Sequence, residues 1–499
     1  MALFDYYQIF LLLLVTFLLY LLSIKRRNNG SAPTNWPIVG MVPGVLPNMH
    51  RFHDYVTQVL NETGGTFEFK GPSFANYDMV FTCDPANIQH IFSKRFSNYP
   101  KGPEFQRIFE VLGNNIFNSD YQLWELHRRA TLSFMNDDNF YVTLEKVTMH
   151  KLRTGLLPIL DYFFENNTVF DMQDILQRFA FDNMCMFFLK HDPMSLRSDL
   201  PNVPCEKGLG DALEPLFYRA LLPEPVWKFQ KWLNIGKEKT LKESWEAFDD
   251  FIYKHISSNT ELDMFKYFNK AYEASGELGY SRNLKRFLRD TFLGLLFAGR
   301  DSLSVSLTWL FYLISTNPSV ETKICEEIEN VLGVKKDEGE NPRFFSVEEC
   351  EKLVYLHATL CETLRLYPAI GIELKTPAEQ DVLPSGNSVH TNTKVAVSFY
   401  STGRMESVWG KDCMEFKPER WITPGGGIKH EPSSKFPAFN VGPRTCPGKK
   451  MSFIEMKMVT AFVVHRFRVR VVESESVTPR NAIMLKADHG MRVMLSRKD

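Results

Sequence analysis

The chain has 499 residues, of which 44% are hydrophobic and 13% aromatic. This composition excludes a disordered or low-complexity protein and requires a large buried core. Lysine and arginine total 58 against 59 aspartate and glutamate residues, so the net charge is -1 and no overall basic field is present to hold a nucleic acid. The eight cysteines are scattered without a C-x-x-C pair, which argues against a zinc site and favours a reducing compartment.

A hydrophobic segment opens the chain. Ile9 to Ile24 carry no charge and are followed at once by Lys25 to Arg27. The run is close to the length of a membrane-spanning helix, and by the positive-inside rule the basic cluster places the rest of the chain in the cytoplasm. A cleaved signal peptide is the alternative, but it requires basic residues before the apolar run and a small-residue cleavage site after it. We therefore expect a membrane anchor over 1–27, a proline-rich connector over 28–45 and one large domain over 46–499.

Helical periodicity dominates the rest of the chain. Strand-like segments are short and cover 66–70, 79–82 and 394–399. The longest helical pattern covers 282–316 and, at 1.5 Å per residue, is about 50 Å long. Further helices are predicted over 346–367 and directly after Cys446, whereas 201–210 and 274–281 are expected to be surface connections. These features predict a mainly α domain with small β-sheets.

One loop carries a residue pattern that favours metal ligation. It runs from Phe439 to Gly448 and delivers Cys446 to the start of a helix. Unpaired N–H groups and the positive end of the helix dipole favour a thiolate over a thiol. A lone thiolate, glycines that let a flat ligand approach, and Arg444 as a partner for a carboxylate suit axial ligation of a haem iron. For an isolated cysteine, a place in the core is the usual alternative.

The same loop resembles the haem-binding loop of the cytochrome P-450 monooxygenases. The pattern F-x-x-G-x-R-x-C-x-G matches at Phe439, Gly442, Arg444, Cys446 and Gly448. The resemblance spans the whole chain and implies the cytochrome P-450 fold, with a large helical domain, small β-sheets and one N-terminal membrane anchor helix. It makes Cys446 the ligand of the iron, pairs Arg444 with a haem propionate and makes 46–499 a haem-thiolate catalytic domain.

Three further motifs follow in the order of the family. Glu362 and Arg365 match its E-x-x-R pair, Arg420 lies in a segment that resembles P-E-R, and Trp124 with Arg128 resembles the W-x-x-x-R of a helix that touches the propionates. On a helix surface, a pair spaced like Glu362 and Arg365 contributes only a few tenths of a kcal/mol. Joined by Arg420 in a buried triad, as the resemblance implies, the pair becomes a structural network in which losing one partner strands a charge.

The long helix contains the stretch A-G-R-D-S, which begins at Ala298 and resembles the A-G-x-D-T-T of the family. Ala298 and Gly299 are small enough for the helix to pass close to a haem face, and Asp301 with Ser302 can relay protons to bound oxygen. Serine replaces the usual threonine and Leu303 replaces the second hydroxyl residue. Because serine lacks the methyl group that restricts its rotamer, we expect a relay that releases more peroxide. An ordinary helix position is the alternative for Ser302.

The substrate is indicated by kinship and by apolar residues. Stretches that begin at Tyr99, Gly403 and Phe436 look like the plant clan of the family that oxidises fatty chains, and the closest type is the mid-chain alkane hydroxylase of wax biosynthesis. Leu374 replaces a histidine common in the relatives, so one propionate contact is expected to be lost. Apolar side chains expected to line the pocket suit an aliphatic ligand, although those at helical spacing are more often ordinary core; they are Phe105, Phe109, Leu293, Leu296, Phe297, Ile370 and Ile372.

The resemblance implies a monooxygenase that hydroxylates long alkanes or fatty acids with haem b, O2 and NADPH electrons. No G-x-G-x-x-G follows a strand, so the electrons are expected from a separate NADPH-cytochrome reductase. Lys449 and Lys450 are candidates for its docking patch, with a solvated basic face as the alternative. Membrane lipid and an apolar small molecule are the other expected partners. We expect a single-pass protein of the endoplasmic reticulum membrane with a cytoplasmic catalytic domain.

Two other functions stay open at this point. A haem-thiolate enzyme with Ser302 and Leu303 in these positions could rearrange or dehydrate an oxidised lipid or couple phenolic substrates. A membrane protein that binds haem or lipid without catalysis is the second alternative.

Overall fold

The computed structural model describes residues 32–74, 77–258, 263–277, 283–333, 342–391, 393–472 and 477–497. The anchor expected over 1–27 lies outside these ranges, as does the beginning of the connector. Within them, no helix combines the length and the apolar character needed to cross a bilayer.

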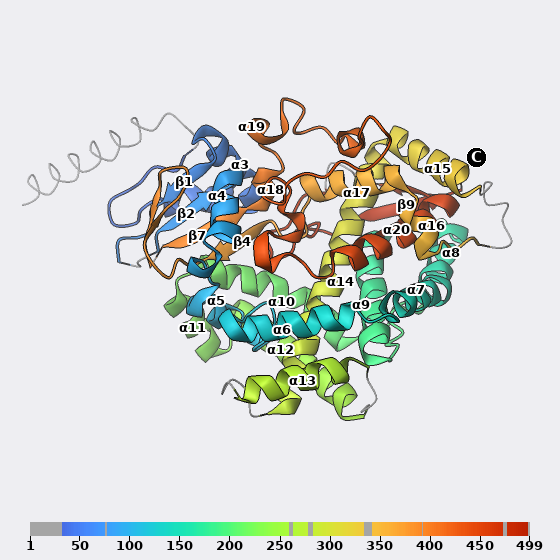
Figure 1. Ribbon diagram of the computed structural model, residues 1–499, viewed down its shortest axis with the longest axis horizontal. Helices are drawn as coiled ribbons and strands as arrows, with labels where there is room; N and C mark the ends of the chain where they lie inside the picture. The colour runs from blue at the N-terminus through green and yellow to red at the C-terminus, as the bar shows by residue number, and fades with distance from the viewer. Residues whose placement is uncertain are drawn as a thin grey trace, which may run out of the picture.

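Helices make up most of the described chain, as the sequence predicts (Figure 1). The α-helices are α2 (Val42–Val45), α3 (Phe52–Glu62), α4 (Pro85–Gln89), α5 (Gly102–Ile108), α6 (Tyr121–Met135), α7 (Phe140–Lys151), α8 (Leu157–Glu165), α9 (Met172–Leu189), α10 (Pro204–Leu221), α11 (Glu224–Leu233), α12 (Gly236–Ser258), α13 (Asp263–Glu277), α14 (Leu284–Thr316), α15 (Pro318–Leu332), α16 (Val347–Glu351), α17 (Val354–Leu366), α18 (Phe399–Thr402), α19 (Glu406–Trp409) and α20 (Lys449–Arg466). The strands are β1 (Thr66–Phe69), β2 (Met79–Thr82), β3 (Phe170–Asp171), β4 (Ile372–Lys375), β5 (Asp381–Val382), β6 (Ser388–Val389), β7 (Lys394–Ser398), β8 (Arg468–Val471) and β9 (Arg492–Ser496).

The strands form small sheets, and the predicted strands over 66–70, 79–82 and 394–399 are confirmed. The four-stranded sheet has the order β1-β2-β7-β4, in which only β2 and β7 run parallel. Every residue of β2 and β7 is buried, so their apolar and β-branched side chains suit the centre of a sheet. Two smaller sheets have the orders β3-β9-β8 and β5-β6. The four-stranded sheet lies at one end of the molecule, with α7, α8 and α15 at the other (Figure 1).

Helix α14 runs through the middle of the core. The side chain of Asn283 caps its first turn by accepting the N–H of Arg286 at 3.0 Å, and Pro318 prevents its continuation beyond Thr316. Its 33 residues correspond to about 50 Å, as predicted. It contacts α9, α12, α17 and α20, so residues on one turn of α14 meet several distant segments (Figure 1).

The prediction that 201–210 and 274–281 are surface connections is wrong in part. Helix α10 already begins at Pro204, and Cys205 and Leu209 are buried. Its glycines serve close packing and not a turn, because a Cβ on Gly208 would lie 3.2 Å from the ring of Phe248 in α12. In the second segment, α13 continues to residue 277, and 278–281 lie outside the described residues.

The helix predicted over 346–367 is divided into α16 and α17. Ser346 and Glu349 form a capping box at the start of α16. The start of α17 is capped by Glu327 of α15, whose carboxylate accepts the N–H groups of Tyr355 and Leu356. Because this cap comes from a distant helix, no local pattern predicts the break.

Candidate functional site

The loop that carries Cys446 closes onto the N-terminus of α20. The N–H of Cys446 donates to the carbonyl of Phe439 at 2.8 Å. Gly442 has a φ of 64°, in the left-handed region, and a Cβ there would lie 2.0 Å from the carbonyl oxygen of Phe92. Glycine is therefore required at this position, both for the backbone conformation and for the close approach of the neighbouring chain.

The surroundings of Cys446 act on its charge in opposite directions. Burial raises the pKa of the thiol, whereas the N–H of Gly448 and the cations Arg128 and Lys449 lower it. Burial has the largest effect, so the pKa of the thiol lies above its ordinary value. A coordinated metal cation would stabilise a thiolate in this position.

A buried charge cluster lies beside this loop. Its cations are Lys101, Arg128, Lys375 and Arg444, and its carboxylates are Asp120 and Glu373. Arg444 pairs with Asp120 and Lys101 pairs with Glu373, both at 2.7 Å. Four basic side chains thus stand against two carboxylates. Among the described residues, neither the Nζ of Lys375 nor the Nε of Arg444 has a hydrogen-bond partner.

The excess of basic over acidic side chains in this cluster favours a ligand that carries carboxylates. Burial is the main reason why the pKa of Lys375 falls to about 7; Glu373 opposes the shift, and Lys101 and Arg444 add to it. Haem carries two propionates, which would accept hydrogen bonds from the Nζ of Lys375 and the Nε of Arg444 and would favour the charged form of Lys375. The residues present therefore fit haem. Arg444, which we expected to pair with a propionate, also has a protein partner in Asp120, which the sequence analysis did not identify.

Helix α6 contributes the W-x-x-x-R pair to the same region. Arg128 donates to the carbonyl of Thr445 at 2.8 Å, directly before Cys446. The guanidinium of Arg444 lies 4.8 Å from the ring centroid of Trp124. The structure thus brings the two sequence motifs together.

One turn of α14 retains accessible surface although the helix around it is buried. Between Phe287 and Phe311, every residue is buried except Ala298, Gly299 and Ser302. This turn, where a flat group is expected, is therefore the part of the buried stretch that keeps surface for a ligand to contact. Gly299 also permits close packing of α9, because a Cβ would lie 2.1 Å from the Sδ of Met184.

Asp301 and Ser302 are neighbours on α14 but point to different partners. The hydroxyl of Ser302 donates to the carbonyl of Ala298 at 2.5 Å. Asp301 is fully buried, and its Oδ1 lies 2.5 Å from Arg300 and 3.5 Å from Lys486, whereas no described group bonds its Oδ2. Lys486 is not among the residues predicted from sequence, because nothing in its local sequence distinguishes it from other lysines.

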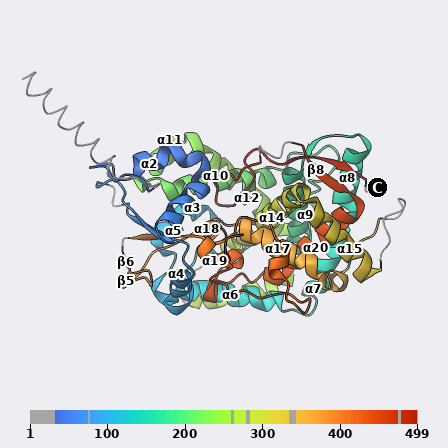
Figure 2. The same cartoon turned by 90° about the horizontal axis from the view of Figure 1, so that it is seen from above.

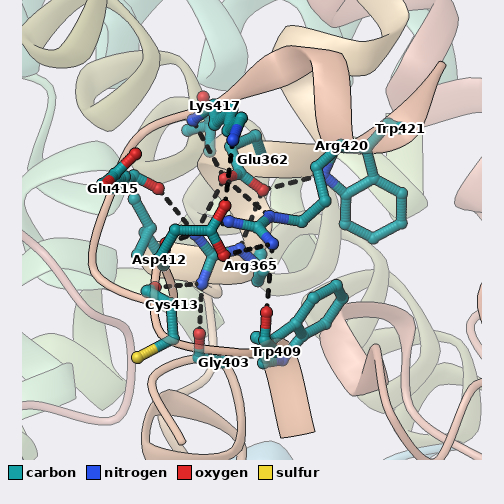
Figure 3. A network of polar contacts seen from close by, with 12 residues as sticks. Glu362, Arg365, Gly403, Trp409, Asp412, Cys413, Glu415, Lys417, Arg420 and Trp421 are labelled. Carbon is teal, nitrogen blue, oxygen red and sulfur yellow. Dashed lines mark hydrogen bonds and ion pairs between the residues drawn. The ribbon is translucent and has the colours of Figure 1, made fainter. Parts of the chain in front are cut away.

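Glu362 is the centre of a buried network that joins α17 to the chain around residues 403–421 (Figure 3). Its carboxylate accepts from the Nε and Nη2 of Arg365, both at 2.8 Å, and from the Nε of Arg420 at 3.4 Å. The indole of Trp421 and the N–H of Lys417 donate to it at 2.8 and 3.0 Å. Arg365 in turn donates to three main-chain carbonyls, those of Gly403, Cys413 and Glu415.

The apolar residues expected to line the pocket fall into different environments. Leu293, Leu296 and Phe297 are buried in the main core, which favours the core alternative for them. Ile370 and Ile372 retain accessible surface. We find that the rings of Phe105 and Phe109, at the end of α5, stack with their centroids 4.3 Å apart.

A separate apolar groove is lined by residues of α2, α3, β1, β2 and the end of α10. Figure 2 shows α2, α3 and α10 at the same end of the molecule. It has a volume of about 320 Å³ and is lined almost wholly by apolar side chains, among them Phe52, Phe69 and Tyr218. None of the residues predicted to line the substrate pocket lines this groove.

Comparisons with known proteins show which family the chain belongs to. A model of the cytochrome P-450 family matches residues 31–491. The chain is 39% identical to noroxomaritidine synthase 2 of Narcissus pseudonarcissus, over 99% of this chain and 97% of that protein. It is 38% identical to alkane hydroxylase MAH1 of Arabidopsis thaliana over the full length of both proteins. It is 36% identical to cytochrome P-450 86B1 of the same plant, over 98% of this chain and 90% of that protein. The chain therefore belongs to the cytochrome P-450 family and is one of its monooxygenases.

Proposed function

We propose that this cytochrome P-450 hydroxylates long aliphatic chains, alkanes or fatty acids, with Cys446 as the ligand of the haem iron. The surplus of basic over acidic side chains beside the Cys446 loop is the observation that carries the haem assignment. The full-length similarity to an alkane hydroxylase and the apolar surfaces of the chain support the aliphatic substrate.

The reaction consumes an alkane, O2, two electrons and two protons and yields an alcohol and water. When bound, haem with a thiolate ligand would supply the cleavage of O2 and the insertion of oxygen into a C–H bond. The chain supplies the remaining functions. Arg128, Lys375 and Arg444 would hold the carboxylates of the haem, and the carboxyl of Asp301 and the hydroxyl of Ser302 would carry the protons that the reaction consumes.

We also propose that the chain is anchored in the endoplasmic reticulum membrane through residues 1–27, with its catalytic domain in the cytoplasm. Pro33 lines the apolar groove and lies six residues after Arg27. An extended chain of that length spans about 20 Å, so the groove lies within this distance of the end of the anchor. Leu46, which also lines the groove, is 63% exposed, and Phe74 and Trp232 are each 78% exposed. Exposed large apolar and aromatic side chains of this kind are typical of a surface that meets lipid.

Electrons are proposed to come from a separate NADPH-cytochrome reductase. Lys449 and Lys450 begin α20, are exposed, and lie close in sequence to Cys446. A basic patch in this position would steer an acidic surface of the reductase toward the thiolate side of the haem.

The test is turnover with labelled oxygen. Purified full-length protein is combined with a plant reductase, NADPH, a long alkane and ¹⁸O2, and the product is analysed by mass spectrometry. Aliphatic hydroxylation predicts an alcohol that carries one labelled oxygen atom. Absence of any labelled product from alkanes and fatty acids would contradict the proposed substrate class.

The second candidate is a haem-thiolate reaction on an oxidised lipid or a phenolic compound. The 39% identity to a noroxomaritidine synthase and the serine at position 302 favour it. Including phenolic compounds and lipid hydroperoxides in the same screen separates the two, because rearrangement, dehydration and coupling leave no labelled oxygen in the product.

A further inference from the structure

A buried ion cluster surrounds Asp301 and draws on distant parts of the chain. Arg300, the neighbour of Asp301 on α14, contacts the carboxylate of Glu206 in α10 and donates to the side chain of Gln177 in α9 at 3.1 Å. The Nζ of Lys486, from the loop between β8 and β9, lies 3.5 Å from the Oδ1 of Asp301. The single carboxylate of Asp301 thus faces two cations.

The main chain beside Lys486 is fixed by the core helices. The indole of Trp309 in α14 donates to the carbonyl of Leu485 at 2.6 Å. On the other side, the amide of Gln173 in α9 exchanges two hydrogen bonds with the main chain of Ala487, at 2.9 and 3.1 Å. Hydrogen bonds to both neighbours therefore hold Lys486 in place beside α14.

The two cations differ in their ability to release a proton. Burial opposes the charge of Arg300, but Asp301 and Glu206 outweigh it and raise the pKa of the guanidinium, so Arg300 stays protonated. Burial lowers the pKa of Lys486 to about 8, with Asp301 acting against the shift and Arg300 acting with it. Asp301 and Arg300 face Lys486 from α14, and Glu206 faces it from α10. Lys486 is the cation of this cluster that can lose a proton near neutral pH.

Access to solvent also distinguishes Lys486 from Asp301. Asp301 has no exposed surface, whereas the side chain of Lys486 is 8% exposed. Gly210 of α10 covers the cluster closely, because a Cβ there would lie 3.5 Å from the Nζ of Lys486. The side chain of Lys486 thus keeps a small accessible surface next to a carboxylate that has none.

We propose that Lys486 is the proton donor that recharges Asp301 during turnover. An N–H bond of the Lys486 ammonium breaks and an O–H bond forms on Asp301, which leaves a neutral amine and a carboxylic acid. Asp301 passes the proton through Ser302 to the oxygen that is being reduced, and the amine takes a new proton from water at the surface. No electron moves in these steps. The inference rests on the proposed relay of Asp301 and Ser302, and is independent of the substrate.

The decisive variant is Lys486→Arg, because arginine keeps a positive charge beside Asp301 but does not release a proton at neutral pH. We expect normal haem content and a normal substrate-induced spectral shift. Product formed per NADPH consumed falls at least tenfold, peroxide rises, and the solvent isotope effect on turnover increases. Lys486→Met gives the same loss of coupling. The matched control is Arg480→Met in the same loop, whose side chain pairs with Glu214, and it retains wild-type coupling.

A measurement without turnover checks the titration of Lys486. Between pH 8 and 10.5, Lys486 is protonated in the unfolded chain and neutral in the folded chain. Because the unfolded state binds more protons, the free energy of unfolding rises with pH over this range. The midpoint of chemical unfolding of the wild type should therefore rise relative to that of Lys486→Arg. Parallel midpoints would overturn the proposal.

The coupling measurement separates this inference from the relay on which it rests. If Lys486→Arg stays within twofold of wild-type coupling while Asp301→Asn is impaired, Lys486 is only a counter-ion and the inference is wrong. If Asp301→Asn also keeps its coupling, the relay itself is wrong and the role of Lys486 fails with it. Impaired coupling in both variants supports the donor role.

Discussion

Replacing Glu362 with glutamine removes the charge at the centre of the network in Figure 3 and changes almost nothing in the size of the side chain. The carboxylate accepts five hydrogen bonds, and an amide has only one oxygen to replace its two. Arg365, which is fully buried, and Arg420 would lose their shared anion.

The magnitude follows from what the two arginines retain. Breaking a buried ion pair by removing one partner costs about 3–5 kcal/mol. Arg365 keeps its three main-chain carbonyls and Arg420 keeps Asp412 at 3.0 Å, so both guanidinium groups stay partly satisfied. We therefore expect Glu362→Gln to lower the free energy of unfolding by about 3 kcal/mol, at the lower end of that range.

Urea unfolding followed by tryptophan fluorescence measures this loss, which corresponds to a shift of the midpoint by roughly 1 M or less, because the urea slope of a large protein is at or above about 3 kcal/mol/M. The matched control is Lys352→Ala, which breaks an exposed pair with Glu348 at 3.0 Å and should change stability by less than about 0.5 kcal/mol. A loss below about 1 kcal/mol in Glu362→Gln would show that the network does not depend on its charge and would refute the reasoning.

Other positions give predictions of equal specificity. Gly442→Ala places a Cβ 2.0 Å from the carbonyl oxygen of Phe92, so the fraction of purified protein that binds haem should fall sharply; an unchanged haem content would contradict this. Ser302→Thr restores a restricted rotamer and should lower the peroxide released per NADPH, and an unchanged peroxide yield would refute the leaky relay. Burial raises the pKa of Glu455 to about 8, although the hydrogen bond from Asn183 at 2.6 Å acts to lower it. The folded state therefore keeps a proton on Glu455 that the unfolded state loses above about pH 4.5. Wild-type stability should therefore fall by a few kcal/mol as the pH rises from 4.5 to 8, and Glu455→Gln should abolish this fall; equal slopes in the two proteins would contradict it.

The sequence predicts those features that depend on neighbouring residues. The short strands follow from runs of β-branched and aromatic residues, and the end of α14 follows from Pro318. The position of Cys446 directly before α20 follows from the glycine and proline residues of its loop. Glu362 and Arg365 share a helix face because they are three residues apart, and the structure adds that this face is buried.

The features that the sequence does not predict depend on contacts between distant segments. Asp120 pairs with Arg444 across 324 residues, and Lys486 meets Asp301 from a loop near the C-terminus. Leu293 lies at the right helical spacing to face a pocket, yet the packing of the core buries it. Spacing identifies which residues share a face of a helix, but which neighbour covers that face is decided by the tertiary structure.

The central claim is that the sulfur of Cys446 binds the haem iron as a thiolate. The spectrum of the reduced protein with carbon monoxide tests it most directly, measured on the wild type and on Cys446→Ser at equal haem content. We predict the red-shifted band of thiolate-bound haem in the wild type and its absence in Cys446→Ser. Persistence of that band in the serine variant, or its absence from haem-loaded wild type, would contradict the account.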